Sequence, residues 1–247
     1  MSDAPTTTDA SFPTTRWTIV RQASEDDWRT AKEALESLCA DYLKPLRAYA
    51  RSRGQSDADA RDTVQEFLSR FVASGGFAKA DKPEGRLRTF LLRSLRNFIT
   101  DQWRRQQTAR RTVERNAVSL DDSSLQEIAD AAVDSDKASE AYDREWARFV
   151  MDKTLSRIRA DYQSRDRLGL FEKILPLVEG RSVSEEERQS LCRELDLTSN
   201  AFGVAVHRLR NRLARTLREV IRDTVEDDAD IEDELRYLGR VLRGEPE

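Results

Sequence analysis

Apolar residues recur at spacings of three and four along most of the chain, and this pattern predicts helices rather than strands. In the first half it predicts helices over residues 28–53, 56–75 and 86–111, preceded by a short helix over residues 16–23. Pro45 lies inside the first of the three, where we expect it to break or kink the helix.

The second half predicts helices from residue 141 through 158, over residues 170–180 and 184–195, and from residue 199 to about 225. Ser184 with Glu187 has the spacing of a capping box, and Thr198 is suited to cap the last helix. Only three residues join the last two helices. Two helices joined so closely predict a helix-turn-helix.

Residues 116–140 differ from their surroundings, because they are acidic and rich in small residues and show little apolar periodicity. Such a composition is typical of a tether. We therefore predict an all-α fold of two small helical domains joined by an acidic flexible linker. The predicted parts are an N-terminal extension at 1–27, a first domain at 28–115, the linker at 116–140, a helix-turn-helix domain at 141–222 and an acidic C-terminal extension at 223–247.

Composition supports helices and argues against an enzyme. Only nine Gly and six Pro occur in 247 residues, few for a hairpin-rich sheet protein. His207 is the only histidine, and Cys39 and Cys192 lie far apart, so we expect no metal site, no disulfide, no cofactor and no catalytic group. The sequence lacks a secretion signal and an apolar run of membrane-spanning length, which predicts a cytoplasmic protein with no membrane partner.

The net charge of -4 conceals four blocks of alternating sign. Residues 86–115 carry nine arginines against two acids, a net charge of +7, and residues 116–146 carry -7. Residues 201–222 carry six arginines against one acid, or +5, and residues 223–247 carry -7. Two basic segments in an acidic chain predict two surfaces that bind a polyanion.

The last long helix has one apolar stripe and one polar face. Its polar face suits a major groove, with the first turns over base edges and the later arginines over phosphates. A solvated charged face is the alternative reading of the same pattern. The predicted DNA-binding residues of the helix-turn-helix are Asn200, Val204, His207, Arg208, Asn211, Arg212 and Arg215.

In residues 86–115, aromatic and basic side chains alternate. Such a surface stacks unpaired bases on its rings while its arginines hold the backbone. The alternative is a core helix, and we assign Phe90, Leu91 and Phe98 to that core. The predicted DNA contacts are Arg93, Arg96, Asn97, Trp103, Arg104 and Arg105.

Three segments resemble sigma factors of the extracytoplasmic-function (ECF) type. Residues 59–67 read Asp-Ala-Arg-Asp-Thr-Val-Gln-Glu-Phe, similar to the family's Asp-Ala-Glu-Asp-Leu-Val-Gln-Glu-Val. Residues 90–97 resemble the stretch that opens the minus-ten element. Residues 195–198, and then Phe202 with residues 206–210, resemble the family's turn and its Leu-His-Arg-Ala-Arg recognition helix. The opening residues 12–17 and the acidic tail resemble a subgroup with extensions at both ends.

The resemblance implies a non-enzymatic subunit that binds core RNA polymerase and directs it to promoter DNA. Its contact with the polymerase beta-prime clamp helices is expected at Asp59, Asp62, Thr63, Gln65 and Glu66. The minus-ten contacts are those predicted in residues 86–115. An anti-sigma factor or a Ser/Thr kinase is a further class of partner.

Two departures from the family pattern raise further hypotheses. Residues 203–205 read Gly-Val-Ala where the family usually has Lys-Ser-Arg, which puts minus-thirty-five readout in question. Arg61 and Thr63 replace the family's Glu and Leu in the clamp-docking segment. A phosphate on Thr63 would restore the lost negative charge. The alternative is that the Thr63 methyl group packs in the core.

Alternatives to a sigma factor stay open at this point. A helix-turn-helix repressor or activator would explain residues 184–222 but not the segments before the linker. A regulatory adaptor that binds polymerase without promoter-specific initiation would fit the change at residues 203–205. For the tail, residues 231–242 are expected either to form a helix that docks on the second domain and competes with DNA for its arginines, or to stay solvated.

Overall fold

The computed structural model describes residues 28–73, 86–114, 124–225 and 227–245, and these contain helices and no strand. The all-α prediction is therefore confirmed. The helix predicted over residues 16–23 and the extension at 1–27 lie outside the described residues. The helices are α2 (Trp28–Ser52), α3 (Asp57–Ala73), α4 (Leu87–Glu114), α5 (Ser124–Ser164), α6 (Leu168–Val178), α7 (Glu185–Glu194), α8 (Ser199–Arg222) and α9 (Ala229–Arg243).

Local sequence signals explain most of the helix ends. Gly54 has φ 86° just after α2, a conformation that costs glycine little. Ser184 forms the predicted capping box with Glu187, and Thr198 accepts a 3.2 Å hydrogen bond from the backbone N–H of Ala201. Of the break or kink expected at Pro45, the break is wrong, because α2 continues through this residue.

The larger hydrophobic core joins parts of the chain that are far apart in sequence. It contains Tyr42 and Leu46 of α2, Phe67 of α3 and Leu91 of α4. It also contains residues from α5, from the end of α8 and from α9. These late contributors are Ala138, Tyr142, Trp146, Ala147, Val150, Val220, Ile221, Val225, Tyr237 and Leu238.

The prediction of a flexible linker over residues 116–140 was wrong for residues 124–140, which belong to the 41-residue helix α5. Their alanines and acids are compatible with a helix, but they lack the bulky apolar periodicity on which the prediction relied. From Ala138 onward, α5 buries its side chains in the larger core. Tertiary packing thus continues a helix that the local pattern does not mark.

A smaller core holds the helix-turn-helix together. It consists of Ile158 of α5, Phe171 and Ile174 of α6, Cys192 of α7, and Phe202 and Leu209 of α8. The predicted apolar stripe of α8 therefore serves two cores. Phe202 and Leu209 lie in the smaller one, whereas Val220 lies in the larger one.

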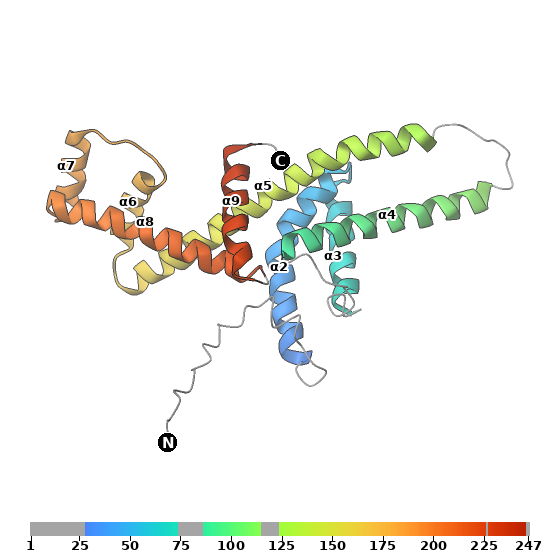
Figure 1. Ribbon diagram of the computed structural model, residues 1–247, viewed down its shortest axis with the longest axis horizontal. Helices are drawn as coiled ribbons and strands as arrows, with labels where there is room; N and C mark the ends of the chain where they lie inside the picture. Colours follow the sequence, from blue (N-terminus) through green and yellow to red (C-terminus); the bar gives the residue numbers. More distant parts are fainter. Residues whose placement is uncertain (1–27, 74–85, 115–123, 226, 246–247) are drawn as a thin grey trace, which may run out of the picture.

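Figure 1 shows the resulting arrangement, in which α6, α7 and the start of α8 lie at one end and α2, α3 and α4 at the other. Helix α5 runs between the two ends, and α9 crosses it where they meet. An isolated antiparallel bridge pairs Arg86 with Val225, and Leu87 donates a 3.0 Å backbone hydrogen bond to Thr224. The start of α4 is thus fastened to the end of α8.

Candidate nucleic-acid interfaces

Helix α4 presents the predicted minus-ten residues on its exposed side. Trp103 is 46% exposed, and Asn97, Arg93, Arg104 and Arg105 are also exposed. The exposed Arg96 is oriented by weak hydrogen bonds to the Tyr49 hydroxyl (3.4 Å) and the Ser139 hydroxyl (3.3 Å). An exposed indole beside exposed guanidinium groups can stack a base and hold its phosphate.

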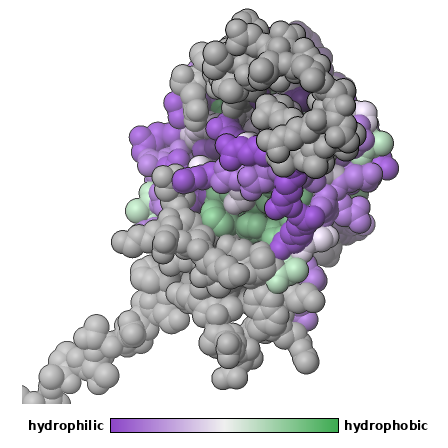
Figure 2. Space-filling model, turned by 90° about the vertical axis from the view of Figure 1, so that its right-hand side faces the viewer, coloured by the Kyte–Doolittle hydropathy of each residue, from purple (hydrophilic) through white to green (hydrophobic). Residues whose placement is uncertain are grey.

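The side chains that we assigned to the core of α4 do pack inward. Leu91 is fully buried, and Phe90 and Phe98 pack against the larger core. Phe98 and Phe90 lie beside the rings of Phe67 and Phe71 of α3, with ring centroids 5.7 and 5.6 Å apart. Figure 2, a view of the side at the right of Figure 1, shows apolar surface in its middle with polar side chains above it and to its right.

Helix α3 carries the residues expected to face polymerase. Asp59, Asp62 and Gln65 are exposed, whereas Glu66 is half-buried and accepts a 2.8 Å hydrogen bond from the Gln102 amide. Thr63 is only 9% exposed and belongs to the buried side of α3. A kinase needs access to the hydroxyl, so the burial of Thr63 favours the packing alternative over the phosphorylation switch.

Helices α7 and α8 are joined by a four-residue turn in which Asp196 has φ 51°. The predicted recognition residues Asn200, Val204 and His207 are exposed on α8. Val204 is 40% exposed, which is a large exposed fraction for an apolar side chain. Apolar side chains at such positions contact thymine methyl groups in a major groove.

A pocket of about 360 Å³ lies beside the middle of α8, and arginines dominate its lining. Its arginines from α8 are Arg208, Arg212 and Arg215. The turn between α5 and α6 adds Arg165 and Arg167, which the sequence analysis missed. Asp161 is the only acid in the lining, and it pairs with Arg212 (2.8 Å) and Arg165 (3.0 Å).

Neither Arg167 nor Arg208 has a carboxylate within ion-pair distance among the described residues, and both are exposed. The pocket therefore keeps an excess of positive charge at the part of α8 where the sequence pattern predicts phosphate contacts. No pattern marks Arg165 and Arg167 in the sequence, since they follow the end of α5 and reach α8 only through the fold.

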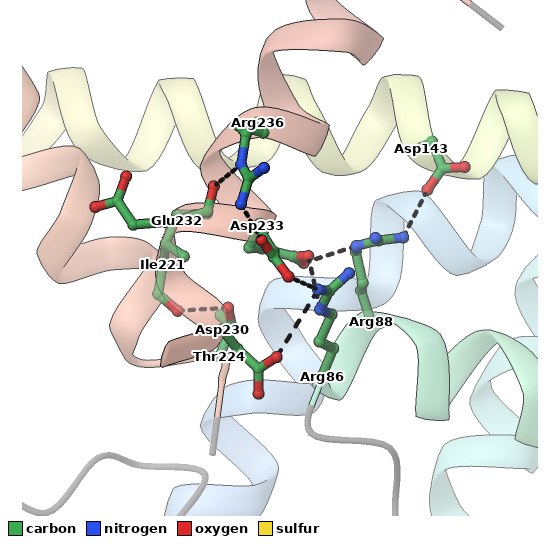
Figure 3. Close-up of polar contacts among 10 residues, drawn as sticks. Arg86, Arg88, Asp143, Ile221, Thr224, Asp230, Glu232, Asp233 and Arg236 are labelled. Atoms are coloured by element: carbon green, nitrogen blue, oxygen red, sulfur yellow. Dashed lines mark hydrogen bonds and ion pairs between the residues drawn. The ribbon is translucent and has the colours of Figure 1, made fainter. Parts of the chain in front are cut away.

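Helix α9 forms ion pairs with both basic segments of the chain, at the start of α4 and at the end of α8. Figure 3 shows Arg86, just before α4, and Arg88 of α4 extending toward the acidic face of α9. The Arg88 Nε lies 2.7 Å from Glu234 Oε1, and Arg88 Nη1 lies 3.4 Å from Asp143 of α5. Arg86 lies 3.3 Å from Asp233 and 3.8 Å from Asp230.

The pair of Arg88 and Glu234 is buried. Glu234 is 1% exposed, and the Arg88 guanidinium lies 3.7 Å from the centroid of the Tyr237 ring. Burial alone would lower the pKa of Arg88, but the charge of Glu234 and its hydrogen bond hold that pKa above the ordinary value. Arg88 therefore stays charged, and its pairing in the core leaves it unavailable to a ligand.

The same helix also engages the end of α8. Glu232 pairs with Arg218, and Asp228 pairs with Arg222 at 2.6 Å. The hypothesis of a docked tail is thus supported over a solvated one, but the docking surface differs from the expected one. Tyr237 and Leu238 of α9 belong to the larger core rather than to the helix-turn-helix core.

Two negative observations apply to the described part of the chain. It contains no cluster of His, Cys, Asp or Glu side chains that could hold a metal ion. None of its helices combines the length and the apolar character needed to cross a membrane.

In a comparison with protein families, residues 38–109 match Sigma-70 region 2. This segment contains most of α2, all of α3 and most of α4. The match supports a sigma-70 family factor, a class of proteins that are not enzymes and that act with RNA polymerase at promoters. Comparisons with curated proteins and with solved structures gave no match.

Proposed function

We propose that the chain is a sigma factor of the ECF type, which binds core RNA polymerase and directs promoter recognition and opening. The match of residues 38–109 to Sigma-70 region 2 carries this proposal, because it contains both the acidic surface of α3 and the basic surface of α4. In this proposal α2–α4 form the region 2-like part, and residues 141–222 form the region 4-like part with its helix-turn-helix.

Each surface takes a separate role. Exposed Asp59, Asp62 and Gln65 on α3, together with Glu66, contact the polymerase clamp. Asn97 and Trp103 hold the opened minus-ten strand while neighbouring arginines hold its phosphates. Around α8, Val204 lies at the bases and the arginine pocket takes backbone phosphates.

The test is reconstituted transcription on genomic fragments with core polymerase, followed by start-site mapping. Addition of the chain is expected to produce run-off transcripts from a few defined starts, and core polymerase alone is the control. A chain that binds DNA but no core polymerase would be an ordinary helix-turn-helix regulator.

An adaptor that binds polymerase without specific initiation is the second candidate, and residues 203–205 favour it. A Cβ atom added at Gly203 would meet nothing within 4 Å beyond its chain neighbours and the backbone of its own helix, so packing inside the protein does not require this glycine. Gly203→Ala should therefore stabilise α8 by up to about 1 kcal/mol. If the Gly203 backbone approaches DNA closely, the same change weakens promoter binding. Unchanged binding with polymerase association intact would favour the adaptor.

A further inference from the structure

The pocket beside the middle of α8 is a concave site that three segments of the chain build together. Its volume of about 360 Å³ lies in the range of sites for small molecules. Asp161 and Tyr162 come from the last turn of α5, and Arg165 and Arg167 come from the turn that leads into α6. Figure 1 shows α5 crossing α8 before it reaches this turn. Helix α8 completes the lining with Arg208, Asn211, Arg212 and Arg215.

The charge of the lining exceeds what one phosphate of a DNA backbone can neutralise. Among the described residues, five arginines and one acid line the pocket, a net charge of +4. A backbone phosphate carries one negative charge, whereas a terminal phosphate carries about -1.5 to -2 and each further phosphate in a chain adds to it. Arg167 and Arg208 are exposed and have no carboxylate within ion-pair distance in the described part of the chain. A short chain of phosphates therefore matches the pocket better than a single diester does.

An aromatic ring adjoins these arginines. Tyr162 lines the pocket and is half-buried, and its ring packs on Phe171 with the ring centroids 5.4 Å apart. Phe171 is buried in the smaller core, so the Tyr162 ring is supported from within the protein. Nucleobases stack on such rings while arginines hold the phosphates. The Asn211 amide can in addition donate to or accept from the edge of a base.

Several contacts order the pocket without a ligand. The Arg167 backbone N–H donates a 2.8 Å hydrogen bond to the Tyr162 carbonyl, which closes the turn between α5 and α6. Asp161 pairs with Arg212 (2.8 Å) and with Arg165 (3.0 Å). A site that is ordered in advance loses less conformational entropy when a ligand binds.

We propose that this pocket binds a free nucleotide that carries two or more phosphates. The base stacks on Tyr162, and the phosphate chain pairs with Arg167 and Arg208, which have no ion pair among the described residues. A DNA duplex does not fill the pocket in this way, because its backbone is convex and its bases are stacked on one another. The duplex can place a phosphate only at the mouth of the pocket.

Nucleotide and DNA use the same arginines in this proposal. Arg208 and Arg215 lie on the face of α8 that we assign to backbone phosphates. A bound nucleotide therefore lowers the affinity for DNA, and DNA lowers the affinity for the nucleotide by the same factor. This competition rests on the proposed function, whereas nucleotide binding itself does not.

Isothermal titration calorimetry of the full chain, with neither DNA nor polymerase, tests the site. The probes are ATP and GTP, whose purines offer a large stacking surface, and AMP, GMP and inorganic triphosphate. Mg²⁺ is left out so that the phosphate chains keep their full charge. The preferred triphosphate is expected to bind at least about tenfold more tightly than its monophosphate, which lacks most of the charge, and than inorganic triphosphate, which lacks the base.

Variants assign the binding to the pocket. Arg167→Ala/Arg208→Ala should weaken binding of the preferred nucleotide at least about tenfold. Arg159→Ala/Arg181→Ala removes the same charge from two exposed arginines outside the pocket, each paired with a carboxylate, and should leave binding unchanged. Tyr162→Leu should weaken binding severalfold, whereas Tyr162→Phe keeps the ring and should bind as wild type does. Circular dichroism checks that each variant is folded.

Absence of binding by both triphosphates would overturn the proposal and leave the pocket to DNA phosphates alone. Equal losses in the two double variants would overturn it too, as would equal affinity for inorganic triphosphate and the nucleotide. All three outcomes leave the proposed function intact, because run-off transcription is measured separately. A chain that binds the nucleotide but does not initiate transcription would contradict the proposed function alone.

The competition is measured on a promoter fragment at constant ionic strength. A saturating concentration of the preferred nucleotide should weaken DNA binding severalfold in wild type and leave it unchanged in Arg167→Ala/Arg208→Ala. Equal DNA affinity of wild type with and without the nucleotide would overturn the competition.

Discussion

Arg88 of α4 and Arg208 of α8 come from the two most basic segments of the chain, yet their surroundings are opposite. Arg88 is buried against Glu234 and the Tyr237 ring, whereas Arg208 is exposed with no carboxylate partner among the described residues. The first holds two helices together, and the second is available to a ligand. Net charge along a segment therefore does not measure its capacity to bind DNA. Whether an arginine can bind DNA depends on the partners that the fold places beside it.

The comparison extends to the two cores. The larger core buries Trp146, Tyr42 and Tyr142 completely, and it draws on α2, α3, α4, α5, α8 and α9. The smaller core of the helix-turn-helix has six buried residues. Its helices depend more on local signals such as the Ser184 capping box. We expect substitutions around the buried Arg88 to change stability and substitutions around the exposed Arg208 to change DNA affinity.

The largest effect is expected for Glu234→Ala, because it leaves the buried Arg88 charged with only the longer, 3.4 Å pair to Asp143. The free energy of unfolding should fall by about 3 to 5 kcal/mol. Glu232→Ala, on the same helix but exposed, should change it by less than about 0.5 kcal/mol. Urea unfolding followed by circular dichroism checks both variants. Equal losses would remove the distinction between buried and exposed pairs.

Removal of an arginine from the pocket beside α8 should affect DNA and leave stability unchanged. Arg167→Ala and Arg208→Ala are each expected to weaken DNA binding about tenfold at low salt, and each should reduce the slope of log K against log salt by about 1. Arg159→Ala removes an exposed arginine that is paired with Glu172, and it is the control. The assignment of the pocket would be wrong if all three variants gave the same slope.

The exposed side of α4 gives the next test. Asn97→Ala and Trp103→Ala should each cost about 1 to 3 kcal/mol in formation of the open complex, through lost base contacts or stacking. Core-polymerase affinity should stay unchanged, since neither residue lies on α3. Permanganate reactivity of unpaired thymines measures promoter opening, and Thr100→Ala on the same helix is the control. Full opening by both variants would refute these contacts.

The smallest effect is expected at the start of α7. Ser184→Ala removes the side chain that caps this helix, at a cost of about 1 kcal/mol. Since the smaller core has few buried residues, the loss should appear as a lower melting temperature. Ser190→Ala, in the exposed middle of α7, is the control. Identical melting of the two variants would show that the cap is not needed.

Helix positions and caps were predictable because their signals are local. The capping box at Ser184, the cap at Thr198 and the end of α2 before Gly54 all depend on residues within one turn. Most predicted site residues on α4 and α8 are indeed exposed, because the apolar stripe of an amphipathic helix also identifies its polar face.

The features that the sequence did not reveal are tertiary. Residues 124–140 lack bulky periodicity, and their helix continues into contacts with α2 that no local pattern reports. Arg88 looks like Arg93 in the sequence, but Glu234 lies 146 residues away. Arg167 becomes part of a pocket only when the turn after α5 meets α8.

Hydroxyl-radical footprinting of the wild-type chain with core polymerase, on a promoter found by start-site mapping, shows whether the α4 and α8 surfaces bind separate promoter elements. We expect two protected stretches roughly 25 base pairs apart. Arg167→Ala/Arg208→Ala should remove the upstream stretch and keep the downstream one. A single protected stretch that persists unchanged in this variant would show that the arginine pocket beside α8 does not bind the promoter.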